Sequence, residues 1–323
     1  EAGGRLHSRG TKRIEGQGSG RPLFMRGKWR NIMQQLIGGI EAGGTKMVCA
    51  IGRADGTLIK RGVYPTRSAG ETVEDLCAFF KGSGIAALGI GTFGPVCLNR
   101  ESPRYGCLLA TPKVRWRGFD FAGTMQRALS VPVAIDTDVN AACLGELAFG
   151  SCQGLDSCVY ITVGTGIGVG VCIGGKPLHG MLHPEAGHLT VRRAPGDDFA
   201  GACPVHGDCF EGLASGPAIC ERFGVGEASD LADDQRFLQL ESSYLAQGIA
   251  SCILAYAPER IVLGGGVPDH IPRLLPLVRT QVTRELRGYL DTPELRDLDS
   301  YLVAPGCAGD QGILGAIALA SRA

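Results

Sequence analysis

The sequence lacks the features that mark several classes of protein. It has no apolar run long enough to span a membrane. Its 32 basic and 32 acidic residues cancel, so its charge gives no sign of a nucleic-acid partner or of binding to a membrane surface. No disulfide framework is visible, because the thirteen cysteines are odd in number and scattered without regular spacing. These absences favour free, mostly buried thiols in a reducing, cytoplasmic compartment.

Residues 1–32 differ from the rest of the chain. They are rich in glycine and in basic residues, and they lack the apolar segment of a secretory signal. Such a composition buries too little apolar surface to fold, so we expect a disordered leader over residues 1–35. We expect it to be upstream sequence ahead of a start at Met25 or Met33, with an organelle transit peptide as the alternative.

The sequence is rich in glycine, with 50 among 323 residues, gathered beside apolar runs that are typical of strands. The run "LIGGIEAGGTKMVCAIG" (36–52) predicts a strand, a glycine turn and a second strand. The run "SCVYITVGTGIGVGVCIGGK" (157–176) repeats this pattern, and strands and helices follow each hairpin. We therefore predict two α/β halves facing each other across a cleft, over residues 36–150 and 151–323. The last helix, expected over 308–323, is predicted to pack back on the first half.

Both predicted hairpins turn on a loop of glycine and threonine. Successive glycines expose backbone N–H groups, and an anionic oxygen can approach them closely because no side chain intervenes. Either loop alone is more simply read as a hairpin turn, and neither matches a P-loop or dinucleotide fingerprint, because each leads into a strand. Two matched loops in two matched halves favour a nucleotide whose phosphates are held from both sides. The residues concerned are Gly43, Gly44, Thr45 and Lys46 in the first loop and Gly164, Thr165 and Gly166 in the second.

A third glycine cluster ends another predicted strand, over 259–267. It consists of Gly264, Gly265 and Gly266. An adenine or a ribose could lie against this bare backbone, although a plain connection to the next helix explains the pattern equally well.

Two carboxylates, Asp136 and Asp138, stand where an apolar strand over 131–137 passes into a helix over 138–150. Ligands of open α/β sheets bind at the carboxyl ends of strands. An Asp at a helix start is also the usual N-cap, which is the alternative for Asp138. Phosphoryl transfer to a hydroxyl needs a base that takes the hydroxyl proton, and Asp138 is our candidate, with Mg²⁺ offsetting the phosphate charge.

The stretch "CPVHGDC" (203–209) places Cys203, His206 and Cys209 at matched spacing. Three zinc ligands need a fourth, and His188, fifteen residues earlier, is the nearest candidate. A disulfide between the two cysteines and an incidental loop are the alternatives, the first disfavoured by a reducing compartment. Four protein ligands leave no place for water, so this zinc would be structural. Side chains beside it can bond to sugar hydroxyls on one wall of a cleft, namely Glu185, His188 and Glu211.

Together these motifs resemble the ROK family (repressors, open reading frames, sugar kinases) of the actin/hexokinase superfamily, and within it most closely the bacterial fructokinases. The resemblance covers residues 36–320, through "GGIEAGGTK", "GIGTFGPV", "ATPKVRWRGFDF", "DTDVNAACLGE", "ITVGTGIGVG", "GMLHPEAGHLTV", "CPVHGDCFEGLASGPA", "IVLGGGV" and "GCAGDQGILGAIALA". It implies an α/β, actin/hexokinase-like (ribonuclease H-like) two-domain fold with a central cleft. It also implies a homodimer that uses ATP and Mg²⁺ to phosphorylate D-fructose at its 6-hydroxyl.

The resemblance also assigns roles to individual residues. It implies that Asp138 is the base, that the first two glycine loops meet the phosphates and that the third cluster lies by the adenosine. The positions of Glu185, His188 and Glu211 match sugar contacts, and those of His188, Cys203, His206 and Cys209 match ligands of a structural Zn²⁺. Two departures stand out. Glu41 replaces a frequent Asp, and Thr137 replaces a frequent Asn that contacts glucose, which weakens a glucose-specific interpretation.

Three other functions stay open on the sequence. The protein could phosphorylate glucose, mannose or an N-acetylated sugar, because only pocket geometry decides among hexoses. A sugar-responsive repressor would need an N-terminal helix-turn-helix module, for which residues 1–32 are too short and too rich in glycine. A sugar sensor without catalytic activity is disfavoured by the presence of Asp138.

Overall fold

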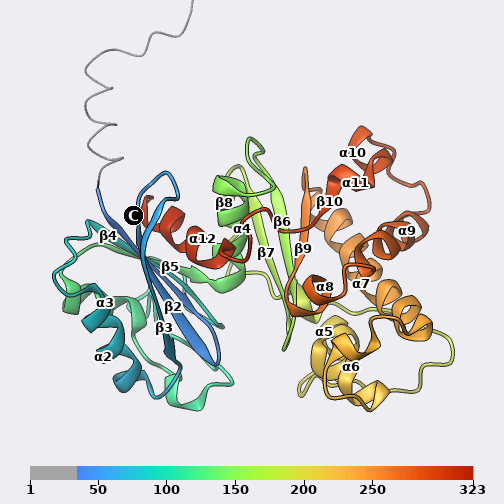
Figure 1. The fold of residues 1–323 in the computed structure, drawn as a ribbon, viewed down its shortest axis with the longest axis horizontal. Helices are drawn as coiled ribbons and strands as arrows, with labels where there is room; N and C mark the ends of the chain where they lie inside the picture. Colours follow the sequence, from blue (N-terminus) through green and yellow to red (C-terminus); the bar gives the residue numbers. More distant parts are fainter. Residues whose placement is uncertain (1–34, 323) are drawn as a thin grey trace, which may run out of the picture.

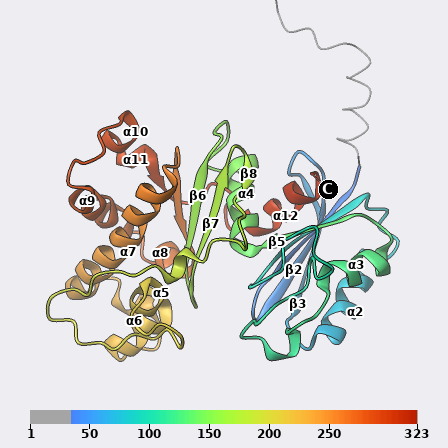
Figure 2. The same cartoon turned by 180° about the vertical axis from the view of Figure 1, so that it is seen from behind.

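The structure is a computed structural model that describes residues 35–322. Apart from Gln35, the leader expected over residues 1–35 lies outside the described residues. Figures 1 and 2 show two α/β halves side by side, each built on its own sheet. Within the described part of the chain, no helix combines the length and the apolar character that crossing a bilayer requires.

The first sheet has five strands in the order β3-β2-β1-β4-β5. The first three strands form an antiparallel meander, and β4 and β5 run parallel to β1. The strands are β1 (Ile37–Ala42), β2 (Lys46–Gly52), β3 (Leu58–Pro65), β4 (Ala87–Thr92) and β5 (Val133–Thr137). One face is covered by α2 (Ala69–Phe80), the 3₁₀ helix η1 (Val114–Trp116) and α3 (Phe121–Leu129).

The second sheet repeats this arrangement with strands in the order β10-β9-β6-β7-β8. Its strands are β6 (Cys158–Val163), β7 (Ile167–Ile173), β8 (Lys176–Pro177), β9 (Ile261–Gly264) and β10 (Leu302–Val303). As in the first half, an antiparallel meander (β6, β7, β8) continues into strands that run parallel to its first member. The predicted repetition of hairpin, strands and helices is confirmed.

Helices cover the outer side of the second sheet and complete its core (Figure 2). In chain order they are η2 (Ala186–His188), α5 (Phe210–Ala214), α6 (Gly216–Phe223), η3 (Ala228–Leu231), α7 (Gln235–Tyr256), α8 (Gly266–His270), α9 (Leu274–Leu286), α10 (Pro293–Arg296) and α11 (Leu298–Tyr301). The strand predicted over 259–267 is shorter than expected, because Gly266 already begins α8.

Two helices, α4 (Asp138–Phe149) and α12 (Gln311–Ala320), stand between the two sheets (Figure 1). Helix α4 is buried from Asn140 to Leu147 because it packs on β6 and β7 as well as on α12. Helix α12 lies on the first sheet, where Gly89 gives it room: a Cβ there would be 1.8 Å from the Ala316 carbonyl oxygen. We propose a boundary between the halves near residue 150, with α12 attached to the first half.

Candidate active site

A cavity of about 270 Å³ lies between the two halves. From the first half it is lined by Gly94, Thr137, Asp138 and Val139, and from the second by Thr162, Gly164, Thr165, Gly166, Ile167, Gly168, Val169, His183, Pro184, Glu185 and Glu211. The cleft predicted from the repeated pattern therefore contains the candidate base Asp138 and the second glycine turn.

Asp138 lies in the first turn of α4, but it does not cap the helix. The N-cap is Thr137, whose hydroxyl accepts from the Asn140 N–H at 3.1 Å. The Asp138 carboxylate accepts only from the Val139 N–H, at 2.9 Å, among the described hydrogen bonds. The pKa of Asp138 is raised to about 7, chiefly by burial and to a lesser extent by the negative charges of Glu41 and Glu185, while the hydrogen bond from Val139 lowers it. The side chain is thus available to a ligand, and the N-cap alternative is wrong.

The strand register brings the first glycine turn to the same edge of the sheet as Asp138. Ala42, which precedes that turn, pairs with Thr92, and Thr92 pairs with Thr137, which precedes Asp138. Neighbouring strands are about 4.8 Å apart, and β4 lies between β1 and β5. The strand ends that lead into the turn and into Asp138 are therefore about 10 Å apart.

The second glycine turn reaches Asp138 from the other half. Strand β7 lies directly on the first turn of α4, where a Cβ on Gly170 would be only 2.0 Å from the Val139 carbonyl oxygen. Because β7 begins at the second turn, this turn and Asp138 line the same cavity.

Both turns are closed by one internal hydrogen bond and leave other N–H groups free. The Gly43 N–H donates to the Lys46 carbonyl at 3.0 Å, and the Gly164 N–H donates to the Gly166 carbonyl at 2.9 Å. Among the described hydrogen bonds none uses the other N–H groups of the turns, those of Gly44, Thr45, Thr165 and Gly166. Free N–H groups in a side-chain-free turn are what an anionic oxygen binds.

A second cation, Lys113, lies over the first turn. Its Cε would be 3.0 Å and its Nζ 3.4 Å from a Cβ on Gly44. The motif "ATPKVRW" holds Lys113 there, because the Lys113 N–H donates to Thr111 and the next turn is anchored by the buried Trp116. The sequence reasoning named Lys46 for this charge and missed Lys113, although it quoted the motif.

The third glycine cluster borders a second cavity of about 250 Å³. Gly265 has a φ of 99°, which favours glycine, and a Cβ there would be 2.6 Å from Val163 backbone atoms. Of the cluster, Gly266 lines this cavity, together with Gly164, Gly216, Glu227, Ala228, Ser229, Val267 and His270. Since Gly164 lines both cavities, they meet at the second turn.

Two of the three predicted sugar-contacting side chains line the first cavity. Glu185 is half exposed, with its Oε1 3.4 Å from His183 Nδ1. Glu211 accepts from the Ile167 N–H at 3.1 Å, so it supports the second glycine turn as well. His183 also lines the cavity, and it was not among the residues predicted from the sequence. The only sequence signal for it is its position two residues before Glu185 in "HPEAGH". His188 is not among the lining residues.

His188 instead joins a cluster with Cys203, His206 and Cys209, whose donor atoms all lie within 4.8 Å of one another. His188 Nδ1 is 3.8 Å from Cys203 Sγ and 3.5 Å from Cys209 Sγ, and His206 Nδ1 is 3.7 Å from Cys203 Sγ. Tetrahedral zinc with usual bond lengths separates sulfur and nitrogen ligands by about 3.6 Å. These separations and two free thiols fit a four-coordinate zinc, so we propose this site for it.

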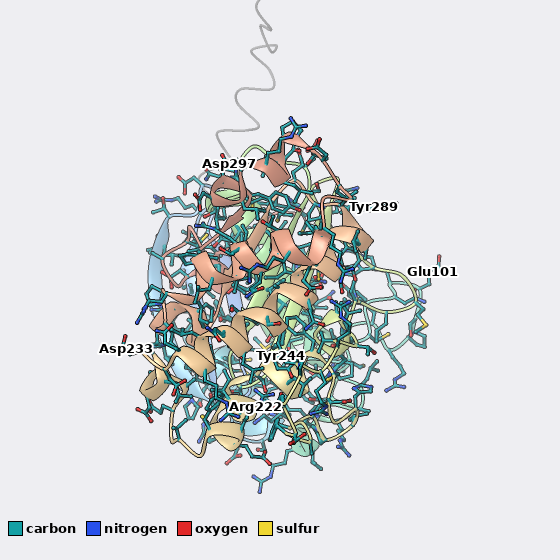
Figure 3. The ribbon with its side chains drawn as sticks, turned by 90° about the vertical axis from the view of Figure 1, so that its right-hand side faces the viewer. Glu101, Arg222, Asp233, Tyr244, Tyr289 and Asp297 are labelled. Atoms are coloured by element: carbon teal, nitrogen blue, oxygen red, sulfur yellow. The ribbon has the colours of Figure 1, made fainter. Side chains whose placement is uncertain are left out.

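The loop that carries the two cysteines is anchored upstream by a buried ion pair. Asp197 Oδ1 lies 3.3 Å from Arg222 Nε, and Asp197 Oδ2 accepts from the Tyr244 hydroxyl at 2.5 Å. Arg222 comes from α6 and Tyr244 from α7, on the half that faces the viewer in Figure 3. The cluster is therefore attached to the helical core of the second half.

Comparison with known proteins shows the family of the chain. The ROK family profile matches residues 37–323. A Bacillus subtilis protein provisionally named fructokinase is 48% identical over 289 residues, which are 89% of this chain and 96% of that protein. A fructokinase from Zymomonas mobilis is 40% identical over 298 residues, covering 90% of this chain and 98% of its own length.

The chain belongs to the ROK family. A ROK family glucokinase from Streptomyces griseus, solved in complex with glucose and AMPPNP, has a TM-score of 0.71 and 25% identity, over 89% of this chain and all of that one. This likeness confirms the expected fold class, the two-sheet α/β fold of ROK sugar kinases. In this chain the first cavity lies between the two halves of that fold.

Proposed function

We propose that this ROK family protein is an ATP-dependent hexose kinase whose substrate is D-fructose, phosphorylated at the 6-hydroxyl. The observation that carries the proposal is Asp138, a carboxylate with one hydrogen bond, in a cavity bordered by a glycine turn with free N–H groups. Relatives named fructokinase that align with about nine-tenths of the chain support the choice of sugar. A cytoplasmic homodimer is part of the same proposal.

The proposed nucleotide lies across the two connected cavities. Its adenosine occupies the cavity beside Gly266, and its phosphates reach the free N–H groups of the second turn from one half and of the first turn from the other. Lys46 and Lys113 offset phosphate charge beside the first turn. Bound with the nucleotide, Mg²⁺ would neutralise further charge on the phosphates.

In the proposed reaction the sugar lies between Asp138 and the wall formed by Glu185 and Glu211. The 6-hydroxyl oxygen forms a bond to the γ-phosphorus of ATP, the bond from that phosphorus to the bridging oxygen breaks, and ADP leaves. The hydroxyl proton passes to Asp138, whose raised pKa suits a proton acceptor near neutral pH. The proposed zinc acts through structure alone: it ties His188 in η2 to the Cys203–Cys209 segment, which leads into α5 and Glu211.

Thr137 is the residue from which we expect a bias against glucose. Its hydroxyl caps α4, so it offers the sugar no amide of the kind that contacts glucose in relatives with Asn at this place. A site without the matching polar group discriminates against the substrate that needs it.

The deciding experiment is an ADP-release assay with ATP, Mg²⁺ and a panel of fructose, glucose, mannose and N-acetylmannosamine. We expect kcat/KM for D-fructose to exceed that for each other sugar by at least about tenfold, which corresponds to about 1.4 kcal/mol. A higher value for glucose or mannose would refute the sugar assignment. Binding of a hexose without any turnover would refute the kinase assignment and support a sensor.

A further inference from the structure

The segment after β8, residues 178–185, crosses from the second half to the first. Two of its histidines make the contact: His179 Nε2 is 2.9 Å from Asp136 Oδ2, and His183 Nε2 accepts from the Val96 N–H at 3.4 Å. His183 belongs to the cavity already described. His179 lies outside it and is 36% exposed, so its contact with Asp136 needs a separate explanation.

Asp136 is the centre of a buried polar network. Its carboxylate is 2% exposed, and a buried carboxylate is tolerated only when its oxygens have partners. Oδ1 accepts from the Thr137 N–H and from Asn140 Nδ2, both at 2.8 Å, and Oδ2 meets His179. Asn140 Oδ1 in turn accepts from the Val171 N–H at 3.2 Å. The network therefore joins β5, α4, β7 and the crossing segment.

This network brackets the candidate base. Asp136 lies two residues before Asp138, and Asn140 lies two residues after it. Val171 is on β7, the strand that begins at the second glycine turn. The network thus sets the place of the Asp138 backbone relative to that turn, although none of its side chains lines the cavity.

We propose that His179, together with Asp136 and Asn140, is a positioning residue that holds Asp138 in register with the phosphate-binding turn. The inference rests on the proposed function, in which Asp138 takes the hydroxyl proton. Among the residues from 35 to 322, His179 is the one side chain of the second half that contacts the Asp136 carboxylate, and it supplies the partner of Oδ2. A misplacement of about 1 Å at a reacting group can lower a rate about 100-fold, which makes such a network consequential for kcat.

The test compares His179→Ala with His179→Gln, whose side-chain amide can donate to Asp136 from nearly the same place as Nε2. We expect His179→Ala to lower kcat by about 10- to 100-fold with KM for the hexose almost unchanged. Its melting temperature should fall by only a few degrees, because Asp136 Oδ2 loses its side-chain partner but water can reach the opened site. His179→Gln should keep kcat within about threefold of wild type. Free imidazole should restore part of the activity of His179→Ala, because the site is open to solvent. Met181→Ala, a fully exposed neighbour, is the matched control and should behave as wild type.

The outcomes separate this inference from the proposed function. If wild type phosphorylates no hexose, the proposed function fails. If wild type is active and His179→Ala keeps its kcat, the positioning role is refuted. It is also refuted if kcat, hexose KM and melting temperature change together, or if Gln is as damaging as Ala. If His179→Ala does not fold, the comparison uses His179→Asn in its place. The Asn side chain is too short for its amide to reach Asp136, whereas that of Gln can.

Discussion

At the scale of the residue, two aspartates two positions apart have opposite environments. Asp136 is buried with a partner for each oxygen, whereas Asp138 has one backbone partner and lines a cavity. The first can only support structure, and the second can accept a proton from a ligand. Burial raises the pKa of Asp138 because the charged form loses hydration without gaining a cation.

The raised pKa of Asp138 predicts an acid limb in the activity. The carboxylate must be deprotonated to act as a base, so kcat/KM should fall about tenfold per pH unit below a pKa of about 7 and level off above it. Initial rates at low hexose concentration between pH 5 and 9 measure this. A flat profile down to pH 5.5 would contradict it.

The variant Asp138→Asn separates activity from stability. Turnover should fall by at least about 1,000-fold while the hexose still binds. Because the native carboxylate keeps its proton up to about pH 7 and the unfolded one loses it near 3.9, the native state is destabilised as pH rises through this window. The variant should therefore melt several degrees higher than wild type at pH 8, and at about the same temperature as wild type at pH 4. Wild-type turnover by the variant would show that another group is the base.

At the scale of the element, one cavity residue, Glu211, is carried by a very short helix. Helix α5 has five residues, and it begins directly after Cys209 and carries Glu211. Such a helix is too short to be stable by itself, so neighbouring contacts must hold it. Those contacts are the Cys and His cluster before it and the Asp197 and Arg222 pair that anchors the incoming loop.

Loss of the proposed zinc should affect both stability and turnover. We expect about one zinc per chain in protein purified without chelator, and none in Cys209→Ser. Because metal binding contributes to folding, Cys209→Ser should melt at least about 5 °C lower and should lose most of its activity through Glu211. Elemental analysis and thermal unfolding are the measurements.

The matched control for the zinc experiment is Cys220→Ser. Cys220 is a partly exposed thiol in α6, outside the cluster. Its replacement by Ser should therefore leave the zinc content and the melting temperature unchanged. Wild-type protein that contains no zinc, yet melts and turns over normally, would remove the proposed metal.

At the scale of the whole molecule, two sheets of the same topology are joined through α4 and α12. Each sheet has a glycine turn at the carboxyl end of its first strand, and the second of these turns lines the cavity between the halves. We propose that the first turn, at the same sheet edge as Asp138, contributes to the site as well. The two helices cross so closely that a Cβ on Gly315 would lie 1.6 Å from the Ala141 carbonyl oxygen. Because α12 lies on the first sheet and α4 also packs on β6 and β7, this contact links the two sheets.

Because α4 and α12 cross so closely, one methyl group added at Gly315 should lower the stability of the protein strongly. Gly315→Ala should destabilise the protein by about 2 kcal/mol or more, because the backbone of α4 must move away. Gly70→Ala in α2, where nothing lies within 4 Å, is the control and should be stabilising by about 0.4–1 kcal/mol. Urea unfolding measures both changes. An unfolding midpoint of Gly315→Ala equal to wild type would show that the helices can separate freely.

The sequence by itself determined the local elements and the chemistry available to the site. Its repeated hairpins predicted two similar α/β halves, and "DTDVNAACLGE" placed Asp138 at the end of a strand, because strand and helix periods are local properties of the chain. Its Cys and His spacing predicted the cluster at Cys203, and His188 lies in that cluster as expected. What it left open at Asp138 was a choice between base and N-cap.

Only the tertiary structure decided which of these groups meet. Thr137 takes the N-cap, Lys113 reaches the first turn, and His179 contacts Asp136 across 43 positions of the chain. Spacing in sequence carries no information about such contacts, because they depend on how α4 and α12 orient one half against the other. Burial, which raises the pKa of Asp138, likewise exists only once both halves enclose the carboxylate.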